Sequence, residues 1–93
     1  MAVFIVRVEL HEAAWADYET LHEAMGAERF GRTIRDDDGV EHQLPPAEYC
    51  LRETIPRATV LVKAKHAAAR TGKRYSVLVT EAIGATWHNL NQA

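Results

Sequence analysis

FGRTIRDDDGVEHQLPPAEY, the stretch from Phe30 to Tyr49, predicts a β-hairpin arm. Residues 30–35 alternate with the two-residue period of a strand. Residues 36–39, Asp-Asp-Asp-Gly, mark a tight reversal, because Asp accepts local backbone hydrogen bonds and Gly tolerates a positive φ. A returning strand starts at Val40 and is interrupted at Pro45–Pro46, where the N–H donors that a continuous ladder needs are missing.

The hairpin is flanked on each side by one helix and one strand. Before it, residues 2–10 form a strand that is apolar on both faces along half its length, which is typical of a central strand. Residues 14–27 then carry an apolar stripe at helical spacing. After the hairpin, the sequence predicts a helix over 56–71 and a strand over 74–81.

This β-α-β-β-α-β order predicts a ferredoxin-like α+β fold. Right-handed crossovers would place both helices on one face of a four-stranded antiparallel sheet, with the first strand central. The strand over 30–35 is expected at a sheet edge, where its arginines would protect it from pairing with other chains. We therefore predict a single domain over 1–82 and a C-terminal tail over 83–93, which Trp87 could anchor.

Length and composition describe an ordinary globular chain. The 93 residues suit a single domain, and the apolar share of 47% and charged share of 26% are unexceptional. No apolar run approaches the roughly 18 residues that a membrane span needs, and the first ten residues do not form a signal peptide. The single cysteine, Cys50, excludes an internal disulfide. We expect a cytoplasmic protein with no cofactor and no bound metal.

Charge is distributed unevenly along the chain, although the net charge is only −2. Residues 12–28 carry five acids and no Lys or Arg, whereas residues 57–74 carry six bases and no acid. The open face of the predicted sheet would carry Val3 and Ile5 beside an apolar side chain of the last strand. This apolar face and the complementary charges of the two helices predict a homodimer.

The sequence contains no P-loop, G-x-G-x-x-G, H-E-x-x-H or G-x-S-x-G motif. His11 and Glu12, at the end of the first strand, could move a proton or bind a divalent ion, or could simply be solvated. Two basic groups could follow a phosphate backbone, or could be mixed surface charge that aids solubility. They are Arg29, Arg32 and Arg35 on the expected edge strand, and Lys73, Arg74 and Tyr75 before and at the last strand.

The run F-x-R-x-I-x-D-x-x-G-x-x-x-x-L-P-x-x-x-Y, from Phe30 to Tyr49, resembles the GhoS family of type V antitoxins, which are described as endoribonucleases. The similarity extends from Phe4 to about Thr80. Its markers are the aromatic residue and isoleucine of the second strand, the Asp-to-Gly turn and the pair Gln43–Leu44. The resemblance implies a ferredoxin-like fold, related in shape to CRISPR-associated nucleases, and a protein that binds single-stranded or messenger RNA and could cleave it.

The resemblance also directs attention to particular residues. The family's basic position on the first helix corresponds here to His22. For metal-independent cleavage, His22 or His11 would be the base for the 2′-hydroxyl, and Arg32 or Arg35 the cation for the developing phosphorane charge. Because the first helix leads directly into the second strand, His22 and Arg32 could share one site. The alternative function is a non-catalytic, dimeric ferredoxin-like module that binds a protein or a small molecule.

Overall fold

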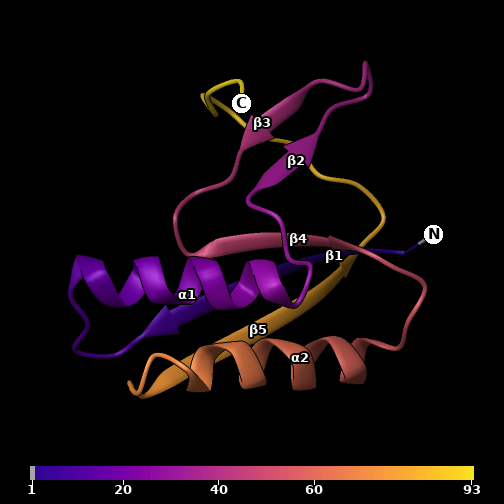
Figure 1. Cartoon of the computed structure of the whole chain (residues 1–93). Coiled ribbons are helices and arrows are strands. Elements are labelled where there is room, and N and C mark those ends of the chain that lie inside the picture. Colours follow the sequence, from indigo (N-terminus) through magenta and orange to yellow (C-terminus); the bar gives the residue numbers. More distant parts are fainter. Residues whose placement is uncertain (1) are drawn as a thin grey trace.

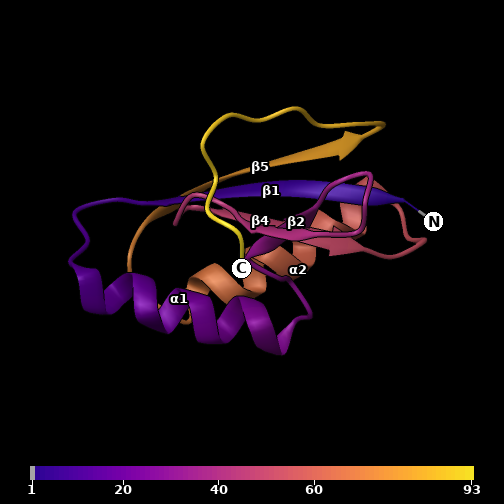
Figure 2. The ribbon, with the colours of Figure 1, turned by 90° about the horizontal axis from the view of Figure 1, so that it is seen from above.

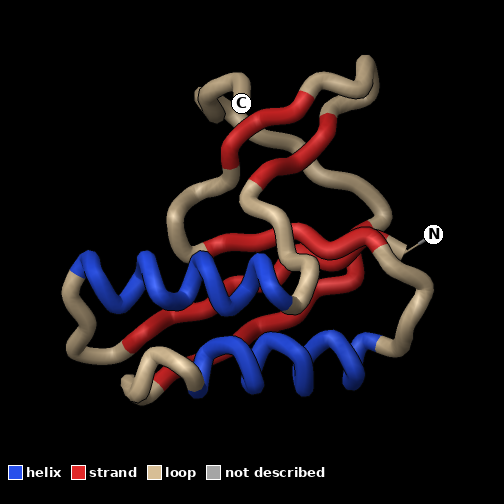
Figure 3. The backbone as a smooth tube through the Cα atoms, in the orientation of Figure 1, coloured by secondary structure: helices blue, strands red, loops and turns tan. Residues whose placement is uncertain are grey.

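The computed structural model describes residues 2–93 and shows an α+β molecule (Figure 1, Figure 3). Its elements are β1 (Val3–Leu10), α1 (Trp15–Ala27), β2 (Thr33–Arg35), β3 (Glu41–Gln43), β4 (Glu48–Arg52), α2 (Arg57–Ala69) and β5 (Tyr75–Ala82). The two helices pack against each other and cover one face of an antiparallel sheet, and the C-terminal segment crosses the other face (Figure 2). Neither helix has the length and apolar character that crossing a bilayer requires.

β1 lies at the centre of the main sheet, between β4 and β5. Val3 is paired with Arg52 on one side and with Ala82 on the other. The even-numbered side chains from Phe4 to Val8 have no exposed surface, because they belong to the main core beneath the helices. The central place predicted for the first strand is therefore confirmed.

The prediction of one four-stranded sheet is wrong. The main sheet has three strands in the order β4-β1-β5, and β2 pairs with β3 in a separate two-stranded sheet. Before β2, the chain meets the main sheet at Gly31, which exchanges two backbone hydrogen bonds of 2.8 Å with Cys50. Beyond Gly31 the chain pairs with the returning strand instead of with β4, because the tight turn makes the returning strand its nearest neighbour along the sequence. Pro45 and Pro46 lack N–H donors and separate this pairing from β4.

The reversal between β2 and β3 has the chemistry that its sequence predicts. Oδ1 of Asp36 accepts hydrogen bonds from the backbone N–H groups of Asp38 and Val40, both at 2.9 Å. Oδ2 lies 3.0 Å from Nε2 of His42, and this hydrogen bond is the main cause that lowers the pKa of Asp36. Gly39 has a φ of 83°, a conformation that a side chain would oppose.

The C-terminal residues cover part of the face opposite the helices. Two backbone hydrogen bonds, of 2.8 and 3.0 Å, tie residues 91–93 to β3. A second small core forms beneath this segment, from Ile34, Leu44 and Cys50 with Val3, Ile5, Trp87 and Leu90 packed against them. The apolar surface of Val3 and Ile5, which we expected to need a partner chain, is therefore half-buried by the protein's own hairpin and tail.

α1 ends in a Schellman motif in which Arg29 takes the left-handed conformation, with a φ of 72°. The N–H of Arg29 donates to the carbonyl of Gly26, and that of Phe30 to the carbonyl of Met25, each at 3.0 Å. Phe30 and Met25 are both buried in the main core, which supplies the hydrophobic part of the motif. Glycine usually occupies the left-handed position, so Arg29 is held there by its neighbours.

Replacing Arg29 by glycine should stabilise the protein by about 1 kcal/mol, because glycine adopts this φ without the clash of a Cβ atom. Urea unfolding followed by circular dichroism measures the change. Arg70→Gly is the matched control, since Arg70 is the C-cap of α2 with a φ of −67° and glycine relieves nothing there. A smaller free energy of unfolding for Arg29→Gly than for the wild type would contradict this account of the end of α1.

Candidate functional site

His22 and Tyr49 form a hydrogen-bonded pair where α1 packs over β4. Nδ1 of His22 lies 2.6 Å from the Tyr49 hydroxyl oxygen, and the tilted rings have centroids 5.7 Å apart. Tyr49 is fully buried, because strand alternation turns it to the helix-facing side of β4, opposite Val6 in β1. Nε2 of His22 has almost no accessible surface and no hydrogen-bond partner among residues 2–93.

The charge of Arg32 acts on both rings of this pair. Burial is the largest cause that lowers the pKa of His22, and Arg32 is the second, against a smaller opposing effect of Glu19. Burial also raises the pKa of the Tyr49 hydroxyl, and Arg32 partly offsets that rise. Both rings are therefore neutral near neutral pH. Of the residues predicted for catalysis, His22, His11, Arg32 and Arg35, the structure places Arg32 near enough for its charge to act on His22.

His11, another of these residues, lies elsewhere. It follows the end of β1, where its Nε2 is 2.9 Å from the hydroxyl oxygen of Ser76. Val6 is paired with Tyr49 in the sheet, and the extended chain from Val6 to His11 is roughly 16 Å long. His11 therefore does not belong to the site of His22 and Arg32.

Three arginines, Arg29, Arg35 and Arg52, line a groove and a pocket beside the segment that leads from α1 into the hairpin, and are here called the arginine edge. Arg32 lines neither of them. Arg29 and Arg52 line one groove of about 280 Å³, and Arg35 and Arg52 line a neighbouring pocket. Arg35 lies 3.4 Å from a carboxylate oxygen of Glu41. In the described part of the chain, no carboxylate lies within 4.0 Å of the guanidinium groups of Arg29 and Arg52.

The second predicted basic group is at the opposite end of the sheet. β5 begins at Tyr75, beside the last residue of β1, whereas Arg52 is paired with the first residue of β1. The two groups are therefore separated by the length of β1, roughly 23 Å. Nζ of Lys73 lies 3.9 Å from a carboxylate oxygen of Asp17, and Tyr75 packs against the main core. Lys73, Arg74 and Tyr75 thus do not extend the arginine edge.

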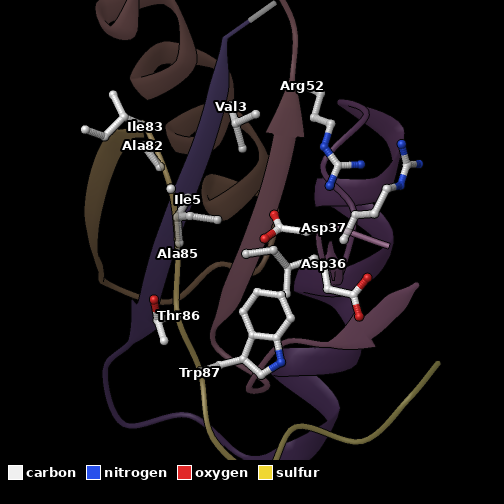
Figure 4. Close-up of a pocket in the computed structure, with 13 residues that line it drawn as sticks. Val3, Ile5, Asp36, Asp37, Arg52, Ala82, Ile83, Ala85, Thr86 and Trp87 are labelled. Carbon is white, nitrogen blue, oxygen red and sulfur yellow. The ribbon is translucent and has the colours of Figure 1, made fainter. Parts of the chain in front are cut away.

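An open pocket of about 430 Å³ lies on the sheet face opposite the helices (Figure 4). Its floor is the apolar start of β1, and its walls are the hairpin turn and the tail after β5. Figure 4 shows Trp87 at one end, Arg52 at the other and Asp37 between them. The sequence analysis missed Arg52, although the signal was present: Tyr49 and Leu51 alternate to the helix side, which turns Arg52 to the open face.

The cysteine and the potential metal ligands are the other groups of this chain that could carry chemistry. Cys50 is buried, and burial is the main cause that raises the pKa of its thiol, as expected for a small residue of the core. Across residues 2–93, no group of three or more His, Cys, Asp or Glu side chains is arranged to hold a metal ion.

Comparison with known proteins adds no assignment to this geometry. A scan against protein-family models and a search of curated proteins both gave no match.

The lowered pKa of His22 predicts an acid-dependent loss of stability. The unfolded chain binds a proton at His22 near pH 6.5, and the folded chain binds it only at lower pH. This contribution is therefore complete above about pH 6.5 and is lost as the pH falls from there to the pKa of the folded state. His22→Gln removes the titration, so on going from about pH 7.5 to about pH 5 the variant should lose less stability than the wild type.

Urea unfolding at the two pH values measures this difference, with His88→Gln, at an exposed histidine of the tail, as the control. If the difference in stability between wild type and His22→Gln is the same at both pH values, His22 does not experience the burial and charge described above.

Proposed function

We propose that this chain binds single-stranded RNA along the arginine edge. The observation that supports the proposal is the group of guanidiniums there, two of which, those of Arg29 and Arg52, have no carboxylate partner within residues 2–93. Guanidinium groups bind phosphate oxygens through parallel N–H donors, and neutralising successive phosphates releases counterions. A strand that follows the groove and the adjoining pocket would meet Arg29, Arg52 and Arg35 in turn.

The acidic first helix is compatible with this proposal because of where it lies. Glu19 and Glu23 are exposed on α1, which covers one face of the sheet (Figure 2). The pocket beside Arg35 and Arg52 is lined instead by the C-terminal residues that cross the other face. A polyanion at the pocket is therefore separated from these carboxylates by the sheet. At a Debye length of about 10 Å, near 0.1 M salt, the remaining repulsion is largely screened.

The shape of the surface favours a single strand over a duplex. The groove and the pocket, of about 280 and 430 Å³, are of the size of individual nucleotides. Unstacked bases of a single strand can enter such sites and stack on aromatic side chains, and Trp87 lines the larger one. The preference for RNA over DNA is supported by the resemblance of residues 30–49 alone.

Cleavage is not part of the proposal. A general base must come within hydrogen-bond reach of the proton that it removes. Nδ1 of His22 is already hydrogen-bonded to Tyr49, and Nε2 is enclosed, so neither ring nitrogen can meet a 2′-hydroxyl in this conformation. The neutral His22–Tyr49 pair therefore supports the packing of α1 on β4.

Alanine at Arg29 or Arg52 should weaken RNA binding and reduce its dependence on salt. Fluorescence anisotropy of a labelled single strand, titrated at several salt concentrations, gives the slope of log K against log salt. Each lost phosphate contact should reduce that slope by about 0.7. Arg70→Ala is the matched control, because it removes an exposed arginine at the end of α2 and should leave the slope unchanged.

The RNA recovered from these titrations should be intact, with or without EDTA. Binding that is insensitive to salt, or an equal loss of affinity in Arg70→Ala, would contradict the assignment to the arginine edge. Cut RNA would show that His22 leaves Tyr49 and that cleavage belongs to the function.

The free edge of β5 favours a second candidate function. Within the described chain β5 pairs with β1 on one side only, and its eight residues include no Pro, Lys or Arg that would discourage another strand. Leu78 lies on this strand with 62% of its surface exposed. In this alternative, the molecule is a ferredoxin-like module whose second strand has separated from the sheet, and it forms a homodimer through β5.

Leu78→Lys tests the alternative, because two copies of a new lysine beside a shared edge would repel each other. Light scattering at high micromolar concentration should give the mass of a dimer for the wild type and of a monomer for Leu78→Lys. Val62→Lys is the matched control, since Val62 is 65% exposed on α2. A monomeric wild type, or a control that dissociates equally, would exclude a dimer formed through β5.

A further inference from the structure

The pocket on the open face combines an apolar floor with groups of both charges. Its volume of about 430 Å³ is in the range typical of small-molecule sites. Val3 and Ile5 form the floor, and Trp87 stands at one end (Figure 4). Arg52 stands at the opposite end, and Arg35 also lines the pocket. A single ligand would therefore meet a flat apolar surface, two cations and an acidic side chain.

The two acidic residues of the pocket are not equivalent. The carboxylate of Asp36 already accepts hydrogen bonds from two N–H groups of the turn and contacts His42. The carboxylate of Asp37 has no hydrogen bond or ion pair with any residue in 2–93. Figure 4 shows the Asp37 side chain between Arg52 and Trp87, at the side of the pocket. Asp37 is therefore the acid that is available to a ligand.

We propose that this pocket binds a guanine nucleotide, with the base between Asp37 and Trp87 and the phosphate at Arg35 and Arg52. Guanine presents N–H donors at N1 and N2 side by side, and one carboxylate can accept from both. Adenine presents an acceptor at N1, which would face the carboxylate without a shared proton. The indole and the apolar floor would contact the faces of the base.

This inference rests on the proposed function, because Arg52 belongs both to the pocket and to the arginine edge. A single RNA strand on that edge could place one base in the pocket, and a free nucleotide would use the same contacts. The two sources share one chemistry, and the experiment tests each of them.

Trp87 provides a direct signal of occupancy. The chain has two tryptophans, and the other, Trp15, is 64% exposed at the start of α1, so Trp15→Phe leaves Trp87 as the only indole. In this background, 5′-GMP should change the emission of Trp87, and 5′-AMP should bind about ten-fold more weakly. Guanosine should also bind more weakly than 5′-GMP, because it has no phosphate for Arg35 and Arg52.

Asp37→Asn should remove most of the preference for 5′-GMP and leave the affinity for 5′-AMP unchanged, which also shows that the variant is folded. Asp38→Asn, at the next position of the same turn but outside the pocket lining, should keep the preference. Anisotropy with single-stranded RNA that contains one guanine or none tests the second source. A guanine preference that depends on Asp37 in either arm supports the inference and identifies the source.

Two results would overturn the inference while RNA binding, and its loss in Arg29→Ala, remain intact. One is that neither the nucleotides nor guanine in RNA gives a preference, and the other is that Asp37→Asn keeps the preference. Absence of RNA binding together with an Asp37-dependent response to 5′-GMP would instead overturn the proposed function and leave the nucleotide site.

Discussion

The two hydrogen bonds between Gly31 and Cys50, each 2.8 Å, are the constraint on which the candidate sites depend. They hold the segment after α1 against the outer side of β4 at one point, after which the chain leaves the sheet. Next to that point, on the helix side of the sheet, Arg32 remains beside His22 and Tyr49. Beyond it, the hairpin extends past the edge of the main sheet (Figure 1), and its turn lines the pocket.

Burial and charge are separated across the sheet. On the helix side, the Tyr49 ring is fully enclosed and both it and His22 are kept neutral by burial and by the nearby guanidinium. On the open side and at the β4 edge, cationic groups face solvent, and a turn that satisfies Asp36 internally leaves Asp37 unpaired. In the same hairpin, Asp36 therefore stabilises the turn through its hydrogen bonds, whereas the carboxylate of Asp37 remains available to a ligand.

The sequence predicted this molecule where the signal was local and missed it where the signal was long-range. Apolar residues on both faces of residues 2–10 predicted a central strand, and Asp36 with Gly39 predicted the turn. Periodicity cannot say which neighbour a strand will choose, so residues 33–35 were assigned to the wrong sheet. The prediction that His22 and Arg32 share a region used the fact that the helix leads directly into that segment, and the charge of Arg32 does act on His22. Tyr49 and Arg52 come from a strand whose register only the fold reveals.

The central place of β1 also governs when the molecule can fold. β1 is made first, but its two neighbours are β4 and β5, the latter ending at Ala82, so every ladder of the main sheet joins residues distant in sequence. Such a high contact order slows folding, because the long segments between paired strands must close into loops, at a cost in entropy, before the strands can pair. During synthesis α1 and the hairpin can form locally, but β1 must wait with an unpaired apolar edge until β5 has left the ribosome.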